Sequence, residues 1–321
     1  MVKRMFLLLL CLVCPAWAGF RTAGPPRYLA GDENNPLCTP QWSPDGELIS
    51  VTTPHYAGIW LMRPDGSEMR RITDEPGAGF GLQWSPDGAS ILARVGRTEG
   101  HRRHNALKRF DIASSRDTLL TAFRTGIVGL PCWGSDGREV FASMNGSLQR
   151  IPSGLEPALL QRRADRPLWF LDGDRAMLLA PAAEKAAAVA ALAGRRIFNL
   201  VQSADGGRVA FQILGGPLCV MRSDGTGLVE LGAGEHPGFS PDGQHLVFMV
   251  TQDDGHTITG SDLYIIGADG TGRTKLTSTE GRSEMHPAWS PRGDAILYDL
   301  YETGEIWSLP VTQDESIEKR D

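Results

Sequence analysis

The sequence predicts an all-β protein, a β-propeller of four-stranded blades, and three observations support that prediction. A five-residue motif recurs with a mean spacing of about 41 residues, the length of one four-stranded propeller blade. Each copy is followed by short β-type runs that are separated by glycine-containing turns. Glycine and proline, at 38 and 21 of 321 residues, are more abundant than in a typical helical or doubly wound protein.

The recurring motif reads Trp-Ser-Pro-Asp-Gly where it is complete, at Trp42 and at Trp84. Weaker copies begin at Trp133, Trp169, Gln202, Phe239 and Trp289. Proline ahead of Asp-Gly presets a turn, glycine tolerates a positive φ, and the tryptophan is expected to pack between neighbouring sheets. These seven copies predict seven blades. A ring of six stays open as an alternative, because the alanine-rich stretch 182–193 fits either a strand pair or a short helix.

The two ends of the chain are predicted to share the last blade. Too few residues follow Trp289 to complete a repeat, whereas residues 27–30 (Arg-Tyr-Leu-Ala) resemble the closing strand of other repeats, such as residues 71–73. The N-terminal segment is therefore expected to supply an outer strand and to close the ring. We assign residues 19–313 to the propeller and residues 314–321 to a charged C-terminal tail.

Residues 1–18 have the pattern of a cleaved secretory signal peptide. Lys3 and Arg4 precede an apolar stretch of about 10 residues, which is too short to cross a membrane, and Ala16-Trp17-Ala18 supplies a cleavage site. A lipid anchor on Cys14 is the less favoured alternative. No second long apolar run follows, so we expect a periplasmic or secreted protein that has no transmembrane segment after cleavage.

Charge and missing motifs exclude several function classes. The formal net charge of −6 argues against a general affinity for nucleic acid or anionic membranes. The sequence contains no Gly-x-Ser-x-Gly elbow, no phosphate-binding Gly-x-x-x-x-Gly-Lys loop and no His-Glu-x-x-His pair. These observations disfavour a serine hydrolase, a P-loop nucleotidase and a zinc peptidase.

The first repeat carries a family resemblance. Residues 42–73 combine Trp-Ser-Pro-Asp-Gly with Ile-Trp-Leu-Met-x-x-Asp-Gly and a closing Arg-Ile-Thr, and they resemble the WD-like repeats of the TolB propeller family. The resemblance extends over residues 27–311 and implies a cell-envelope propeller. TolB proteins carry an additional N-terminal domain, for which there is no room between Gly19 and Thr39, so a strict Tol–Pal role is not implied.

In a propeller, the residues that lead into the innermost strands surround the mouth of the central channel. The positions three residues before each motif are Thr39, Gly81, Leu130, Arg166, Asn199, His236 and His286. His236 and His286 occupy equivalent places in adjacent repeats, with Glu235 and Glu284 close by. Paired imidazoles with a carboxylate suit a divalent metal such as zinc or manganese, although each ring can equally be hydrogen-bonded locally.

Two long loops are expected on the same face. Residues 94–109 are strongly basic and include Arg97, Arg102 and Arg103, which suit an acidic protein segment or an anionic glycan. A solvated surface hairpin is the simpler interpretation of this basic arm. The acidic loop 251–262 lacks the spacing of a calcium-binding loop.

These features predict a monomeric binding or scaffolding protein of the cell envelope rather than an enzyme. Its channel-mouth face would hold an envelope protein segment or an anionic glycan, through His236, His286, Arg166 and the basic arm. No cofactor is expected apart from a divalent metal that His236 and His286 could hold. The alternative is a metal-assisted polysaccharide lyase or hydrolase, which a resemblance to the oligogalacturonate lyase propellers implies. That activity would need a third histidine, from His101, His104 or His256.

Overall fold

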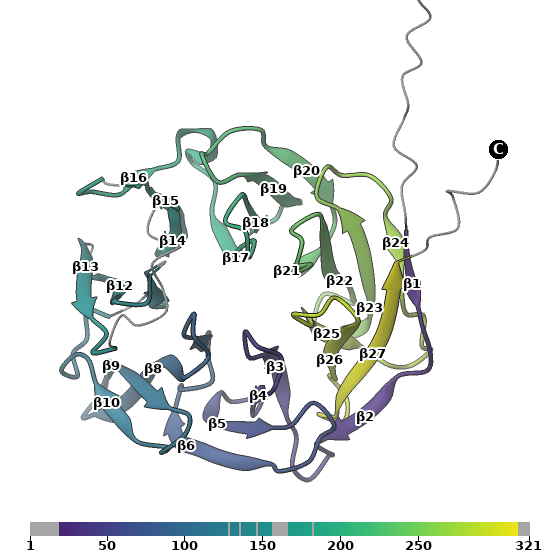
Figure 1. Cartoon of the computed structure of the whole chain (residues 1–321), viewed down its shortest axis with the longest axis horizontal. Coiled ribbons are helices and arrows are strands. Elements are labelled where there is room, and N and C mark those ends of the chain that lie inside the picture. The colour runs from purple at the N-terminus through teal and green to yellow at the C-terminus, as the bar shows by residue number, and fades with distance from the viewer. Residues whose placement is uncertain are drawn as a thin grey trace, which may run out of the picture.

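Seven β-sheets are arranged around a central axis, as predicted, in a computed structural model of the chain (Figure 1). The structure describes residues 19–127, 129–134, 136–145, 147–155, 166–181 and 183–313. The predicted signal peptide and the charged tail 314–321 lie outside these residues. Within the described ranges, no helix is long and apolar enough to cross a membrane.

Within the described residues, five of the seven blades have at least four strands. The first, second, fifth and sixth blades follow the chain order from an inner to an outer strand. Their strands are β3 (Cys38–Trp42), β4 (Ile49–Thr52), β5 (Ala57–Met62) and β6 (Arg70–Pro76); β7 (Gln83–Trp84), β8 (Ser90–Glu99), β9 (Arg102–Asp111) and β10 (Asp117–Leu119); β17 (Ile197–Gln202), β18 (Arg208–Ile213), β19 (Leu218–Arg222) and β20 (Val229–Gly232); β21 (Glu235–Phe239), β22 (His245–Asp253), β23 (Ile258–Gly267) and β24 (Thr274–Lys275).

The recurring motif forms the turn between the first two strands of a blade. In the first blade, the Ser43 hydroxyl donates to Asp45 Oδ1 at 2.6 Å and accepts the Leu48 amide at 2.9 Å. Asp45 also accepts the amide of Glu47 at 3.0 Å. The motif aspartate therefore accepts hydrogen bonds within its own turn and stabilises it, which confirms a structural role for this residue.

Two tryptophans of the motif, Trp84 and Trp133, connect their blade to the one before it. The indole Nε1 of Trp84 donates to Ser50 Oγ at 3.0 Å, and that of Trp133 donates to the Gln83 carbonyl at 3.2 Å. Both acceptors belong to the preceding blade. Seven apolar clusters, each made of side chains from one blade or two adjacent blades, form the core between the sheets.

The seventh blade closes the ring with both ends of the chain, as predicted. It contains β25 (Glu284–Trp289), β26 (Ala295–Leu300) and β27 (Ile306–Gln313), and β27 pairs with both β1 (Phe20–Thr22) and β2 (Arg27–Ala30). The first blade then packs its β3 against β25 and β26.

The fourth blade departs from the predicted repeat. Its strands are β14 (Leu168–Asp172), β15 (Arg175–Leu179) and β16 (Ala187–Ala188), while the third blade has β11 (Cys132–Trp133), β12 (Glu139–Met144) and β13 (Ser147–Pro152). The Pro167 carbonyl accepts from Gln202 at the end of β17, and the Asp174 carbonyl accepts from Ile197 at its start. Strand β14 therefore runs opposite to the inner strand β17.

The motif copy assigned to Trp169 is consequently out of phase. The segment lacks the serine and proline of the complete motif, and its Asp-Gly forms a tight hairpin in which Asp172 pairs with Arg175. The alanine-rich stretch contains both predicted alternatives, the short strand β16 and one 3₁₀ turn, η1 (Ala190–Leu192). The blade is nevertheless present, so the ring has seven blades rather than six.

Candidate functional site

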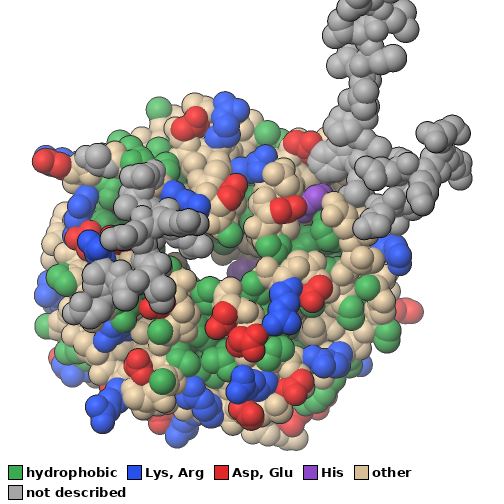
Figure 2. Space-filling model, viewed as in Figure 1, with side chains coloured by type: hydrophobic (Ala, Val, Ile, Leu, Met, Phe, Trp, Pro, Cys, Tyr) green, Lys and Arg blue, Asp and Glu red, His purple; other side chains and the backbone are tan. Residues whose placement is uncertain are grey.

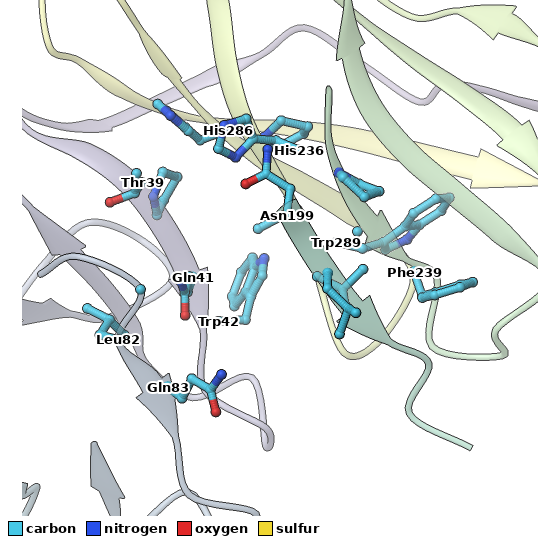
Figure 3. Close-up of a pocket in the computed structure, with 18 of the residues that line it drawn as sticks. Thr39, Gln41, Trp42, Leu82, Gln83, Asn199, His236, Phe239, His286 and Trp289 are labelled. Carbon is cyan, nitrogen blue, oxygen red and sulfur yellow. The ribbon is translucent and has the colours of Figure 1, made fainter. Parts of the chain in front are cut away.

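A cavity of about 630 Å³ lies where the inner strands converge at the centre of the ring. The space-filling view shows an opening there, with a histidine side chain visible within it (Figure 2). The described residues that line the cavity include tryptophans, prolines and amides, together with two histidines (Figure 3). None of these lining residues is Asp, Glu, Lys or Arg.

The channel-mouth positions share an unusual backbone conformation. A positive φ between 48° and 64° occurs at Thr39, Gly81, Asn199, His236 and His286. The strand register shifts across four of these residues, which marks a β-bulge at the start of the inner strand. In five of the seven blades the repeat thus places a left-handed residue at the channel mouth, and all five residues line the cavity.

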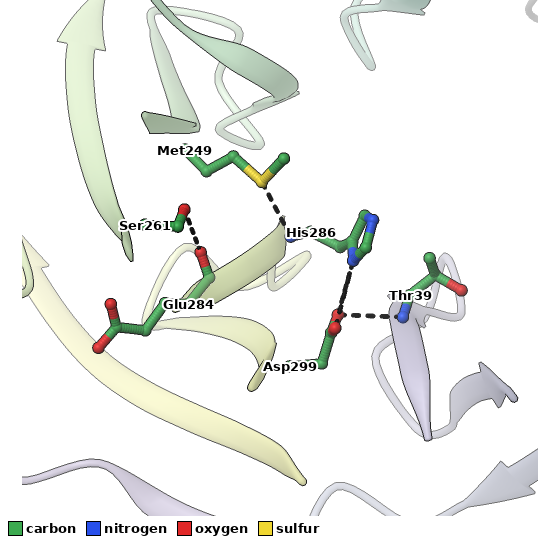
Figure 4. Close-up of polar contacts among 6 residues, drawn as sticks. All are labelled: Thr39, Met249, Ser261, Glu284, His286 and Asp299. Carbon is green, nitrogen blue, oxygen red and sulfur yellow. Dashed lines mark hydrogen bonds and ion pairs between the residues drawn. The ribbon is translucent and has the colours of Figure 1, made fainter. Parts of the chain in front are cut away.

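His236 and His286 face each other across the boundary between the sixth and seventh blades. Their ring centroids are 4.6 Å apart and the ring planes are nearly perpendicular, at 85°. The Nδ1 atom of His286 lies 2.9 Å from Asp299 Oδ1, which also accepts the Thr39 amide at 3.1 Å (Figure 4). Asp299 is buried, so it connects the seventh blade to the first beneath the channel mouth.

The surroundings shift the pKa values of the two imidazoles in opposite directions. Burial, reinforced by the neighbouring His286, lowers the pKa of His236 to about 3. Burial also acts to lower the pKa of His286, but the charge and hydrogen bond of Asp299, aided by Glu235, outweigh it and raise that pKa. The pair therefore combines a His236 that is neutral at neutral pH with a His286 that holds a proton more tightly than an ordinary imidazole.

The two glutamates near the histidines have different environments. Glu235 accepts a hydrogen bond from the Thr251 hydroxyl at 2.7 Å and contributes to the electrostatics of His286. Glu284 is almost fully buried, its carboxylate points away from His286, and Thr277 donates to it at 3.3 Å (Figure 4). Burial raises the pKa of Glu284. The structure thus places Glu235, but not the Glu284 carboxylate, beside the histidine pair.

The predicted arginines do not join the histidines. Arg166 donates to the carbonyl of Ala204, within the motif turn that follows β17, so it lies at the opposite end of the fifth blade from Asn199. This position follows from the reversed direction of β14. On the β8–β9 hairpin, Arg97 pairs with Glu99 at 2.7 Å, and neither Arg102 nor Arg103 lines the cavity.

The residues present do not assemble a metal centre around the histidine pair. Among the described residues, no group of three or more His, Cys, Asp and Glu side chains is arranged to hold a metal ion. His104 lies 3.7 Å from Glu99 on the β8–β9 hairpin, while His101 and His256 are exposed on their loops. None of the three comes to the cavity.

Asp299 is the residue of this site that the sequence interpretation missed. It lies ten residues after the start of its motif, as a single carboxylate within the apolar strand β26. In the fifth blade the residue ten positions after the start of the motif is Gln212, which accepts a hydrogen bond from the Asn199 side chain at 3.0 Å. In the sixth blade it is Met249, whose sulfur accepts a hydrogen bond from the His286 amide at 3.4 Å. This position supports the channel-mouth residues, and the offset from the motif could have revealed it.

The ring of seven blades around a central channel defines the fold as a β-propeller. The chain resembles TolB from Acinetobacter baumannii, with 20% identity and a TM-score of 0.55, over 79% of this chain and 57% of that one. An oligogalacturonate lyase in complex with manganese matches with 14% identity and a TM-score of 0.56, over 95% of this chain and 100% of that one.

A third propeller is equally similar in shape. The β-propeller domain of Swd1 from Myceliophthora thermophila matches with 11% identity and a TM-score of 0.57, over 90% of this chain and 100% of that domain. In sequence, an uncharacterized peptidase of Bacillus subtilis, YuxL, is 34% identical over 83 residues, which are 25% of this chain and 12% of that protein. No family model matches the chain. These likenesses establish the fold, and the chain spans only a small part of the curated relative.

Proposed function

We propose that this protein is a cell-envelope binding protein whose central channel holds an extended segment of another protein. The observation that supports the proposal is the character of the channel, whose described lining combines apolar side chains with amides and two histidines and contains no Asp, Glu, Lys or Arg. Anionic glycans are usually held by Arg or Lys, so a wall without either residue favours a peptide over such a glycan.

Amide side chains strengthen this interpretation. Gln41 and Gln83 line the cavity, and a side-chain amide can both donate a hydrogen bond to a peptide carbonyl and accept one from a peptide N–H.

Site-specific photocrosslinking tests the proposal. Leu130 lines the cavity and is 37% exposed, whereas Leu214 is 52% exposed but does not line it. We expect benzoylphenylalanine at position 130, but not at position 214, to form a light-dependent adduct with a protein in intact cells. The absence of an adduct from position 130, or equal adducts from both positions, would contradict channel binding.

The envelope location rests on residues 1–18, whose sequence has the pattern of a signal peptide. Its test is the N-terminal residue of the protein recovered from the periplasmic fraction. A mature chain that begins at Gly19 would support export. An intact chain that stays with the cytoplasmic fraction would contradict it.

The second candidate is a metal-assisted lyase that acts on an anionic oligosaccharide. It is favoured by the close His236–His286 pair at the channel mouth and by the full-length fold likeness to a manganese-containing lyase. Metal content of protein purified without chelator, compared with a variant that lacks both histidines, decides between the candidates. One equivalent that is lost in the variant would support the lyase, and no metal in either protein would exclude it.

A further inference from the structure

Two guanidinium groups lie together at the rim of the channel, on the β8–β9 hairpin. The guanidinium of Arg103 rests on Gly77 and Gly96, since a Cβ atom on either glycine would come within 2.7 Å of Arg103 Nη2. Arg94 stands on the adjacent strand, and its pKa is lowered by burial and by the charge of Arg103. Glycines at 77 and 96 therefore leave room for the Arg103 guanidinium over the strand that carries Arg94, where its charge acts on that of Arg94.

The pair borders the channel mouth directly. The Arg94 guanidinium donates to the carbonyl of Gly129 at 3.1 Å, and its Cζ atom lies 5.7 Å from the centroid of the Phe80 ring. Phe80 lines the cavity, and Gly129 immediately precedes Leu130, which also lines it. The positive charge of Arg94 thus lies at the rim of a channel whose described lining contains no Asp, Glu, Lys or Arg.

An apolar shelf adjoins the two guanidiniums. Phe80 is 42% exposed and Leu130 is 37% exposed, although both are large apolar side chains. Tyr56 packs edge-on against Phe80 with ring centroids 5.0 Å apart, and Leu130 lies against Gly81. Clustered exposed apolar side chains beside a concave opening are typical of a docking surface.

The charges of the hairpin are unevenly neutralised. Lys108 is paired with Glu75 and Asp117, each at 2.7 Å, and Arg97 is paired with Glu99. Arg103 donates only to the amide oxygen of Asn105, at 3.2 Å, and within the described part of the chain no carboxylate pairs with it. An incoming carboxylate would relieve the repulsion between Arg94 and Arg103 and gain charge-assisted hydrogen bonds.

We infer that Arg94 and Arg103, together with the shelf of Tyr56, Phe80 and Leu130, bind an acidic residue of a partner protein that is followed or preceded by a large apolar residue. The inference rests on the proposed function and specifies which segment the channel accepts. The apolar shelf favours a peptide over an acidic glycan, because a uronate polymer offers no comparable apolar side chain.

Arg103 has a matched control on the same strand. Arg102 is also an exposed arginine, but it lies opposite Glu99 in the hairpin register, and successive residues of a strand point to opposite faces. Arg102→Gln and Arg103→Gln therefore remove the same charge from the same hairpin. Only the second change removes a guanidinium from the pair.

The experiment selects random displayed 12-residue peptides on the immobilised full chain and measures the affinity of the enriched peptides in solution. We expect them to contain Asp or Glu next to a large apolar residue. We also expect Arg103→Gln to weaken binding at least tenfold, Arg102→Gln to weaken it less than twofold, and replacement of the peptide carboxylate by its amide to match the Arg103→Gln loss.

Equal losses in the two arginine variants, or enriched peptides without an acidic residue, would overturn the inference. So would competition by oligogalacturonate at the same concentration as the peptide. If peptides bind in the channel but are indifferent to Arg103→Gln, the proposed function survives and the inference fails. If no peptide is enriched at all, both fail. Unchanged melting temperatures of the two variants confirm that neither has lost the fold.

Discussion

Replacing His236 with Asn should make the protein more resistant to acid. His236 is partly buried, and its pKa falls from an ordinary value of 6.5 to about 3 in the folded chain. Because the folded pKa is the lower one, its contribution to stability is complete above about pH 6.5 and is lost as the pH falls toward 3. Asn has no titrating group and tolerates the left-handed φ of 48° at this position.

The size of the effect follows from the two pKa values. Proton binding to the unfolded histidine alone changes stability by about 1.4 kcal/mol per pH unit well below pH 6.5. At pH 5 the accumulated loss from His236 is about 2 kcal/mol relative to pH 8, a large fraction of a typical stability of about 5–15 kcal/mol. The paired His286 acts in the opposite direction, but it is present in both proteins.

Urea denaturation between pH 4.5 and 8 measures this difference directly. The unfolding free energy of the wild-type chain should fall more steeply with acid than that of His236→Asn, and the two curves should diverge by about 2 kcal/mol at pH 5. His256→Asn, on an exposed loop, should follow the wild type. Parallel curves for His236→Asn and wild type would refute the idea that a partly buried neutral imidazole lines the channel.

Three further substitutions test the site and the closure of the ring. Asp299→Asn should destabilise the fold by about 2 kcal/mol and lower the pKa of His286. The raised pKa of His286 stabilises the wild-type fold fully below pH 6.5, and this stabilisation disappears as the pH rises through the folded pKa. An unchanged NMR titration of His286 in the variant would contradict this prediction. Phe20→Ala should cost about 1–3 kcal/mol in denaturant melts, because the ring packs on Trp289 at 5.0 Å, whereas Phe20→Leu should cost less. Thr39→Gly should raise stability by about 1 kcal/mol in the same assay, since a β-branched residue is held at a φ of 50°, and a loss would refute strain there.

The sequence was sufficient for the architecture because its turns have a chemical cause. The Ser43 hydroxyl donates to Asp45 in the first copy, and the serine and aspartate of the second, fifth and sixth copies form the same hydrogen bond. Spacing between such turns therefore measures the length of a blade. The closing strand at residues 27–30 was predictable for the same reason, because it repeats the pattern of other outer strands.

The sequence was not sufficient where a copy has lost the residues that hold the turn. In the copy at Trp169, only Asp-Gly remains of the Ser-Pro-Asp-Gly turn, and Asp-Gly also forms two-residue hairpins. The sequence therefore did not determine the direction of the strand, and it predicted Arg166 at the wrong end of the blade. Asp299 was missed for another reason. Its partners His286 and Thr39 come from two different blades, and only the closure of the ring brings them together.

The channel mouth shows why a shared propeller fold leaves function open. Each regular blade brings a left-handed residue to the channel, and a second residue, ten positions after the start of the motif, contacts the entry of an inner strand. Backbone geometry fixes both positions, but the residue at the second position varies, from Arg94 in the second blade to Asp299 in the seventh. The side chains that line the channel of a propeller can therefore change without disturbing the turns that determine its fold. In this chain the exchange places positive charge at one side of the rim and a histidine–aspartate pair at the other, with uncharged walls between them. Under the proposed function, that asymmetry would give a bound segment a preferred direction, which a uniformly charged channel would not.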